Sequence, residues 1–264
     1  MDTRTKTKRF QKEVSEKLTK LFVDNLRQNG DIKEILEILT VIVNKNGGDN
    51  DNKISVHKIL ECVNEPETFY FKNDNIINRF GQERGERIYS PRIDLSIAPT
   101  FVRKNERKGR CFMNILLPDG SRSHIYELFE RFSIIQKLKE KINANSNENY
   151  RLINIERDNN YERNRAPLYL FGIEIENSFD KKHLVGDFLN SYILSKYPLV
   201  LIPENQMDIA LDLIKYIHVV KGLKGINFTS LSNVNLLSIK QFKLIINEIL
   251  IEYNIEPMEM DSYG

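Results

Sequence analysis

The chain of 264 residues carries 39 basic and 37 acidic residues, which gives a formal net charge of +2. Net charge therefore singles out no class of partner, and the length fits one domain with an ample core. The two cysteines, Cys62 and Cys111, lack partner spacing, which argues against a zinc site and a disulfide framework. No apolar run is long enough to span a bilayer, and the N-terminal segment is charged, unlike a secretion signal. We expect a cytoplasmic protein with no membrane partner.

The first part of the chain favours helices. Phe10, Val14 and Leu18 recur at helical spacing and predict an amphipathic first helix, whose opposite face is rich in lysine. That basic face is either a phosphate-binding surface or an ordinary solvated face. We expect two more helices, over residues 32–43 and 55–63. The Asn- and Gly-rich loop 44–52 lacks the residue order of a calcium loop, so we interpret it as a solvated turn.

An alternating segment between two prolines predicts a strand with one apolar face. The apolar face carries Ile93, Leu95 and Ile97, and the opposite face carries Asp94, Ser96 and Ala98. Asp94 thus stands among small residues. It is a candidate for a functional carboxylate, and the alternative is that it caps the segment or pairs with a neighbouring arginine such as Arg92.

A basic and irregular stretch follows this strand. Residues 101–110 predict a mobile hairpin tip, whose cationic side chains are Arg103, Lys104, Arg107, Lys108 and Arg110. We then expect a strand over 111–117, a turn at 118–120 and a helix over 123–142. The segment 143–165 is rich in Asn and Arg, with a short strand near 152–155. These side chains match the major-groove edges of adenine and guanine, although an ordinary polar loop explains the composition equally well.

The most informative stretch begins at Pro167. It predicts a central strand covered on both sides, with Tyr169, Phe171, Ile173 and Ile175 on one face and Glu174 and Glu176 on the other. A helix follows, with apolar residues from Leu184 to Ile193 and a cap at Asp180 or Ser178. Residues 198–203 then predict another buried strand. Beyond it we expect a helix over 207–220 packed on the sheet, a strand over 226–231, a helix over 239–253 and a frayed tail over 254–264.

Two carboxylates at the end of a buried strand are unfavourable unless something pairs with them, and a divalent cation is the obvious candidate. If the strand of Asp94 neighbours the strand of Glu174, then Asp94, Glu174 and Glu176 converge on one spot. The alternative is that the two glutamates form salt bridges at the end of the strand.

The order of these features resembles the PD-(D/E)xK nuclease superfamily, and within it most of all the type II restriction endonucleases. Residues 90–94 (Ser-Pro-Arg-Ile-Asp) and 172–176 (Gly-Ile-Glu-Ile-Glu) carry the resemblance. It implies an α/β fold with a restriction-endonuclease-like mixed central sheet flanked by helices. Within a single domain we expect an N-terminal helical region over 1–78, a core over 79–203 and C-terminal helices over 204–264. The core contains a basic insertion over 99–165.

The resemblance also implies residue roles. Asp94 and Glu174 would hold Mg²⁺, and Glu176 would occupy the third catalytic position, where lysine is usual. Lys181 or Lys182 near the start of the next helix is another source for that lysine, so Lys182 is a further catalytic candidate. Lys181 and His183 join the five cationic hairpin residues as candidates for DNA binding. The gap between Asp94 and Glu174, 174 − 94 = 80 residues, is longer than the family commonly shows. The insertion would then be a recognition element.

These roles predict a Mg²⁺-dependent endonuclease that cleaves double-stranded DNA, as a sequence-specific restriction enzyme acting as a homodimer. One alternative is a non-catalytic DNA-binding or assembly module that keeps a nuclease-like sheet. Another is a structure-specific repair or anti-phage nuclease with the same metal site.

Overall fold

The computed structural model describes residues 3–26, 32–46, 54–65, 93–103, 110–111, 126–146, 169–177, 180–224 and 234–260. The helices are α1 (Thr3–Leu26), α2 (Ile32–Asn46), α5 (Ser133–Asn145), α6 (Lys181–Leu194), α7 (Met207–Lys224) and α8 (Ile239–Glu252), with a short 3₁₀ helix η3 (Glu204–Gln206). The strands are β1 (Ile54–Asn64), β2 (Leu95–Arg103), β3 (Arg110–Cys111), β4 (Tyr169–Ile175), β5 (Ser195–Ile202) and β6 (Asn235–Ser238).

The strands form one mixed sheet in the order β1-β2-β4-β5-β6, with the short β3 paired to β2. β1, β2 and β4 are antiparallel neighbours, and β4, β5 and β6 are parallel. The parallel pair β4 and β5 is joined by α6, as parallel strands require a crossover connection. The α/β class and the mixed central sheet flanked by helices are thus as the sequence predicts.

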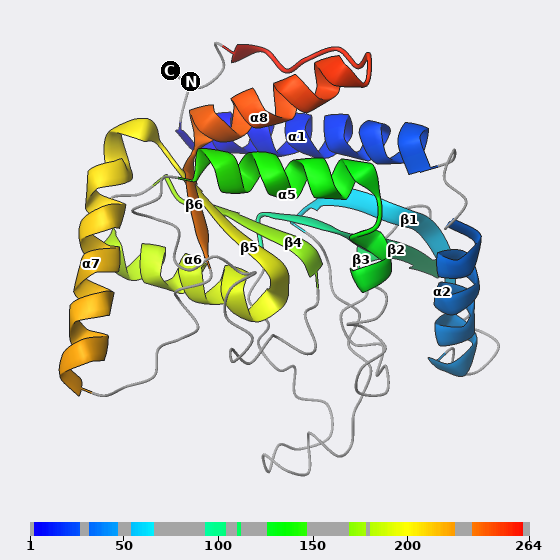
Figure 1. Cartoon of the computed structure of the whole chain (residues 1–264), viewed down its shortest axis with the longest axis horizontal. Helices are drawn as coiled ribbons and strands as arrows, with labels where there is room; N and C mark the ends of the chain where they lie inside the picture. The colour runs from blue at the N-terminus through cyan, green and yellow to red at the C-terminus, as the bar shows by residue number, and fades with distance from the viewer. Residues whose placement is uncertain are drawn as a thin grey trace.

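Helices cover both faces of the sheet (Figure 1). α1, α5 and α8 lie on one face, where their apolar side chains share one buried cluster with the strands. α6 and α7 lie on the other face and pack against β5 and β6 through a second cluster. This layering places α1 and α6 on opposite sides of β4, the strand that carries the two glutamates.

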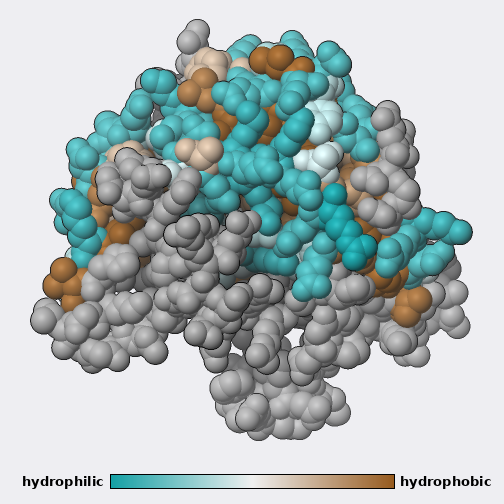
Figure 2. Space-filling model, viewed as in Figure 1, coloured by the Kyte–Doolittle hydropathy of each residue, from teal (hydrophilic) through white to brown (hydrophobic). Residues whose placement is uncertain are grey.

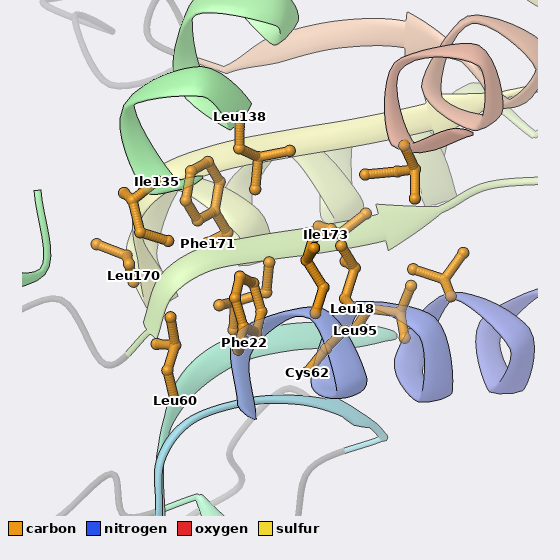
Figure 3. Close-up of a cluster of buried hydrophobic side chains, with 14 of the residues drawn as sticks. Leu18, Phe22, Leu60, Cys62, Leu95, Ile135, Leu138, Leu170, Phe171 and Ile173 are labelled. Atoms are coloured by element: carbon orange, nitrogen blue, oxygen red, sulfur yellow. The ribbon is translucent and has the colours of Figure 1, made fainter. Parts of the chain in front are cut away.

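The core between α1, α5 and the sheet consists of close-packed aliphatic and aromatic side chains (Figure 3). Leu18 and Phe22 of α1 lie beside Leu95 and Ile173 of the central strands, and Phe171 lies between the sheet and α5. Burying each such side chain stabilises the fold by roughly 1.5–3 kcal/mol. The start of β2 and the whole of β4 are therefore held in a rigid interior.

Hydrophilic residues dominate the described surface in the view of Figure 2, where exposed hydrophobic side chains show in several separate places. The exposed large hydrophobic residues are distributed over α2, α6, α7, α8 and the C-terminal segment. Within the described ranges, no helix combines the length and the apolar character that crossing a bilayer requires.

Several predicted elements are confirmed. The apolar stripe of the first helix is buried in α1, and the second helix is present as α2. α6 begins where predicted, and the Asp180 carboxylate caps it by accepting a hydrogen bond from the Lys182 backbone N–H at 2.8 Å. α8 begins with a capping box in which Ser238 and Gln241 each bind the other's backbone.

The prediction of a helix over residues 55–63 is wrong, because this segment is strand β1. Val56, Ile59, Leu60 and Val63 have helical spacing, which led to the error. In β1 the alternation is broken by two register shifts against β2, one between Val56 and Lys58 and one between Lys58 and Glu61. Each β-bulge inserts an extra residue and changes which face the next side chains occupy.

β2 also departs from prediction, because it continues through Pro99 to Arg103 instead of ending at the proline. Pro99 has no N–H to donate, and it lies where two residues of β1 oppose one of β2, between the pairs Lys58–Thr100 and Glu61–Ala98. The far end of β2 pairs with β3, so the predicted hairpin is present, with residues 104–109 between its strands outside the described ranges.

Two residues lie on the sheet face opposite to the predicted one. Ile93 precedes β2 and packs with Tyr169, Ala98 and Leu194 on the α6 side, whereas Leu95 and Ile97 face α1. The bend at Asp94 reverses the direction of the side chain before the regular strand begins. Tyr169 was expected on the face of Phe171, but it packs with Ile93 and Leu194 on the α6 side.

The predicted helix over 123–142 is interrupted at residues 130–132, so that α5 begins only at Ser133. The Glu130 carboxylate accepts a hydrogen bond from the Tyr197 hydroxyl and pairs with Lys196, both on β5. These contacts and the burial of Phe132 fix the chain in a turn at this point.

The frayed tail predicted after residue 253 is also wrong for residues 254–260. Ile255 and Met258 are buried, and the Asn247 side chain bonds both to the backbone N–H of Met258 at 2.7 Å and to its carbonyl at 3.0 Å. The buried Lys243 ammonium donates to the carbonyl oxygen of Glu259 at 3.0 Å. This segment is therefore part of the packed structure.

Some predictions fall outside the described residues. They include most of the loop 44–52, the strand 111–117 beyond its first residue, the turn 118–120, most of the segment 143–165 and the strand 226–231. The last strand of the sheet that the structure describes, β6, was not predicted.

We expect Gly172→Ala to destabilise the protein by about 1–3 kcal/mol, because overpacking a rigid core strains its neighbours. A Cβ atom at Gly172 would lie 2.5 Å from Ile93 Cδ1 and 2.6 Å from Ser195 Oγ. Gly186→Ala on α6 is the matched control, since a Cβ there meets nothing within 4 Å and alanine favours helix. Urea unfolding of both variants tests this, and equal midpoints would contradict it.

Candidate active site

Asp94 and Glu174 meet because β2 and β4 are adjacent and antiparallel. Leu95 pairs with Ile173, so one further step along each strand sets Asp94 opposite Glu174. The Asp94 backbone N–H donates a hydrogen bond to Glu174 Oε2 at 3.2 Å. The predicted condition that the two strands be neighbours is thus met.

The Asp94 carboxylate is held by two donors from different elements. Its Oδ2 accepts a hydrogen bond from the Ile175 backbone N–H at 2.8 Å, and its Oδ1 accepts one from Gln11 Nε2 of α1 at 2.8 Å. The Asp94 backbone is held as well, because its carbonyl oxygen accepts a hydrogen bond at 2.9 Å from the N–H of Glu65, which follows β1 and has φ 43°. These contacts fix the position of the side chain.

Glu174 is 4 % exposed, and one of its carboxylate oxygens, Oε1, has no hydrogen-bond partner among the described residues. A buried, unpartnered carboxylate oxygen is unfavourable by about 1–3 kcal/mol or more. Within the described part of the chain, no lysine or arginine forms an ion pair with Asp94 or Glu174. The protein itself therefore leaves this carboxylate only partly compensated.

Glu176 follows β4 directly, and its backbone N–H bonds to the Leu201 carbonyl of β5 at 3.0 Å. Its side chain is half-buried and hydrogen-bonded to Asp187 of α6. It lines a small depression together with the polar residues Asp180, Lys181 and Gln206 and the apolar residues Leu184, Ile202 and Ile209.

The crowding of carboxylates alters their protonation. Burial raises the pKa of Asp94 from 3.8 to about 6, against the hydrogen bonds from Ile175 and Gln11, which lower it. Burial, with the nearby charges of Asp94 and Asp187, holds the pKa of Glu174 well above 4.5. Burial and the hydrogen bond to Glu176 raise the pKa of Asp187 to about 8. Protons bound by these carboxyl groups thus take the place of the basic side chains that the group lacks among the described residues.

Sequence reasoning missed two residues of this group. Gln11 is 2 % exposed on α1, next to Phe10 in the apolar stripe, and its Oε1 has no partner among the described residues. Asp187 precedes the buried Phe188 on α6. The available signal was a polar residue beside the buried face of each helix. Only the contacts of Gln11 with Asp94 and of Asp187 with Glu176 show that these residues belong to the group.

Where they are described, the basic candidates form no ion pair with Asp94 or Glu174. Lys181, Lys182 and His183 have exposed side chains at the start of α6, and Lys181 borders the depression beside Glu176. The Lys182 backbone N–H takes part in the helix cap, and His183 Nδ1 lies 3.9 Å from Asp180 Oδ2. Arg103 pairs with Ile54 of β1 and Arg110 pairs with Phe101 of β2, and Lys104, Arg107 and Lys108 lie outside the described residues.

A hard divalent cation fits the donor chemistry here, because carboxylate oxygens are its preferred ligands and Glu174 Oε1 lacks any other partner. In the described ranges, no three acidic, histidine or cysteine side chains stand in ready-made coordinating geometry. The carboxylates therefore form a charged group suited to a cation but not a preformed coordination shell.

Comparisons with models of protein families, with curated protein sequences and with solved structures found no match for this chain.

Proposed function

We propose that the chain is a Mg²⁺-dependent endonuclease of the PD-(D/E)xK type that hydrolyses double-stranded DNA. The observation that carries the proposal is the pairing of Asp94 with the buried, partly unpartnered Glu174 at adjacent strand ends. A folded protein retains such an arrangement at a cost in stability, which is typical of a functional site.

The order of elements supports the same proposal. An aspartate stands at the start of β2, Glu174 and Glu176 stand at the end of β4, and α6 and β5 follow in that order. This is the order on which the sequence resemblance to the nuclease superfamily rests. The β1–β2–β4 part of the sheet is antiparallel and the β4–α6–β5 part is parallel, so the motif residues share one end of β4.

Asp94 and Glu174 are the residues that would hold the cation. When bound, a divalent cation supplies a nucleophilic water at neutral pH and stabilises the charge that grows on the phosphate. Mg²⁺ suits this role because it keeps several of its own waters while binding one or two carboxylates.

Other side chains then have distinct tasks. Gln11 orients the Asp94 carboxylate through its Nε2 donor, and the Ile175 N–H fixes the second oxygen. Glu176, which is less buried than Glu174, would accept a proton from the attacking water. Lys181 beside Glu176 supplies positive charge for a phosphate, together with the N-terminal N–H groups of α6.

The substrate and the assembly follow from the same resemblance. Sequence-specific cleavage of both strands of a palindromic site is simplest for a homodimer, in which each subunit cuts one strand. The cationic hairpin residues around β2 and β3, with Lys181 and His183, are then the contacts to DNA.

The test is the conversion of supercoiled plasmid to nicked and linear forms in Mg²⁺ or EDTA by the wild type, Asp94→Asn and Asp212→Asn. We expect cleavage only in Mg²⁺, its loss in Asp94→Asn and its retention in Asp212→Asn, whose carboxylate is exposed on α7. Cleavage that survives in Asp94→Asn would contradict the proposed site.

The other functional classes give different outcomes in that assay. A structure-specific nuclease would cut branched or end-containing DNA in preference to the plasmid, and would require the same two carboxylates. A non-catalytic binding module would bind DNA with a steep dependence on salt and leave it intact under every divalent cation.

A further inference from the structure

We propose that Asp187 of α6 is the fourth carboxylate of this group, beside Asp94, Glu174 and Glu176, and that it is a further ligand of the cation. This inference rests on the proposed function and adds to it a residue that the motif does not contain. It assigns to α6 a direct part in binding the cation.

Hydrogen bonds fix the position of α6 over β4. Ser191 Oγ donates to the Gly172 carbonyl at 2.8 Å and accepts from the Leu199 N–H at 2.9 Å, which ties the helix to both strands. α6 runs in the direction opposite to β4, so residues earlier in the helix lie over residues later in the strand. One helical turn is about 5.4 Å long, close to the length of two strand residues, about 6.6 Å. Because Ser191 lies over Gly172, Asp187, one turn earlier, lies over Glu174.

The contacts of Asp187 agree with this position. Its carboxyl group is hydrogen-bonded to Glu176 and lies close enough to Asp94 and Glu174 for charge–charge interaction with both. The amide of Asn190, three residues later on α6, interacts with the Glu174 carboxylate. Carboxylates from β2, β4 and α6 therefore surround one region.

An independent observation points to a ligand in this region. Glu174 is 4 % exposed, and its Oε1 has no hydrogen-bond partner among the described residues. No described lysine or arginine pairs with Asp187, although Lys181 and Lys182 are on the same helix. The cluster lacks the positive charge that a divalent cation would bring.

The structural alternative is that Asp187 and Glu176 form a hydrogen-bonded clamp between α6 and β4 and nothing more. Asp187→Asn separates the two roles, because asparagine has the same shape and keeps a hydrogen bond to Glu176 but removes the charge. A cation ligand loses affinity in this variant, whereas a clamp does not.

The test is isothermal titration calorimetry of the full chain with Mg²⁺ and with Ca²⁺, without DNA, so that activity plays no part. We expect about tenfold or greater loss of affinity in Asp187→Asn and in Asp94→Asn, and unchanged affinity in Asp212→Asn. Thermal unfolding without metal accompanies it, and Asp187→Asn should unfold at a temperature no lower than the wild type.

Each other outcome overturns the inference in a recognisable way. Wild-type affinity in Asp187→Asn with loss in Asp94→Asn rejects the role of Asp187 and leaves the proposed function standing. A lower unfolding temperature of metal-free Asp187→Asn would show that the carboxyl group itself stabilises the contact between α6 and β4, as a clamp requires and a cation ligand does not. Absence of binding of either cation to the wild type rejects both the proposed function and this inference.

Discussion

The metal-free protein should lose stability as the pH rises from 3.8, the ordinary pKa of aspartate, through about 8, the pKa of Asp187 in the folded chain. In this range the folded state retains protons on Asp187 and Asp94 that the unfolded state has already released. Stability therefore falls with increasing pH, since it falls wherever the folded state binds more protons. For chains of similar size, each kcal/mol lost lowers Tm by about 2–4 °C.

Thermal unfolding in EDTA across this pH range measures the effect, and Asp187→Asn is the control. Above about 6, where Asp94 has largely released its proton, the wild type should lose stability more steeply than the variant, in which only the raised pKa of Glu174 still contributes. Adding Mg²⁺ should restore stability at the alkaline end, because a cation replaces the protons. Parallel curves for the two proteins would contradict the raised pKa of Asp187.

Glu174→Gln should lower the rate of Mg²⁺-dependent DNA cleavage by about 10³-fold or more. Losing a cation ligand removes several kcal/mol of transition-state stabilisation, and each 1.36 kcal/mol is tenfold in rate. The metal-free variant should be at least as stable as the wild type, because glutamine keeps an acceptor for the Asp94 N–H without a buried charge. Single-turnover cleavage and thermal unfolding of the same preparation measure both quantities.

Glu61→Gln is a matched control for this variant. Glu61 is also a strand glutamate with limited exposure, and it bonds to Lys58 at 2.5 Å and to the Thr100 hydroxyl at 2.6 Å, away from the site. We expect it to lose some stability and to keep its cleavage rate. If both glutamine variants lost activity equally, the loss could not be assigned to the carboxylate cluster.

The helices and the central strand were predictable because their patterns are local. The stripe of Phe10, Val14 and Leu18 and the run of apolar residues in β4 specify burial without knowledge of the rest of the fold. β1 was misread because its bulges break the alternation that identifies a strand. The prediction ended β2 too early, at Pro99. A proline is tolerated inside a strand only at a bulge, and the bulge depends on the partner strand β1.

The candidate site was predictable only in part, for a related reason. Asp94 and Glu174 are marked by their positions at the ends of apolar strands, and the pairing of β2 with β4 brings them together. Gln11 and Asp187 join them through the packing of α1 and α6, which no spacing in the sequence encodes. Site residues that come from helices packed on the sheet can be identified only from the three-dimensional structure.

The most direct test of the central claim is digestion of unmethylated phage DNA by the wild-type chain in Mg²⁺ and in EDTA. The proposed function predicts discrete fragments that form only with Mg²⁺ and that disappear when Asp94 and Glu174 are each replaced by alanine. DNA that is bound but never cut under any divalent cation would contradict the claim and favour a binding module.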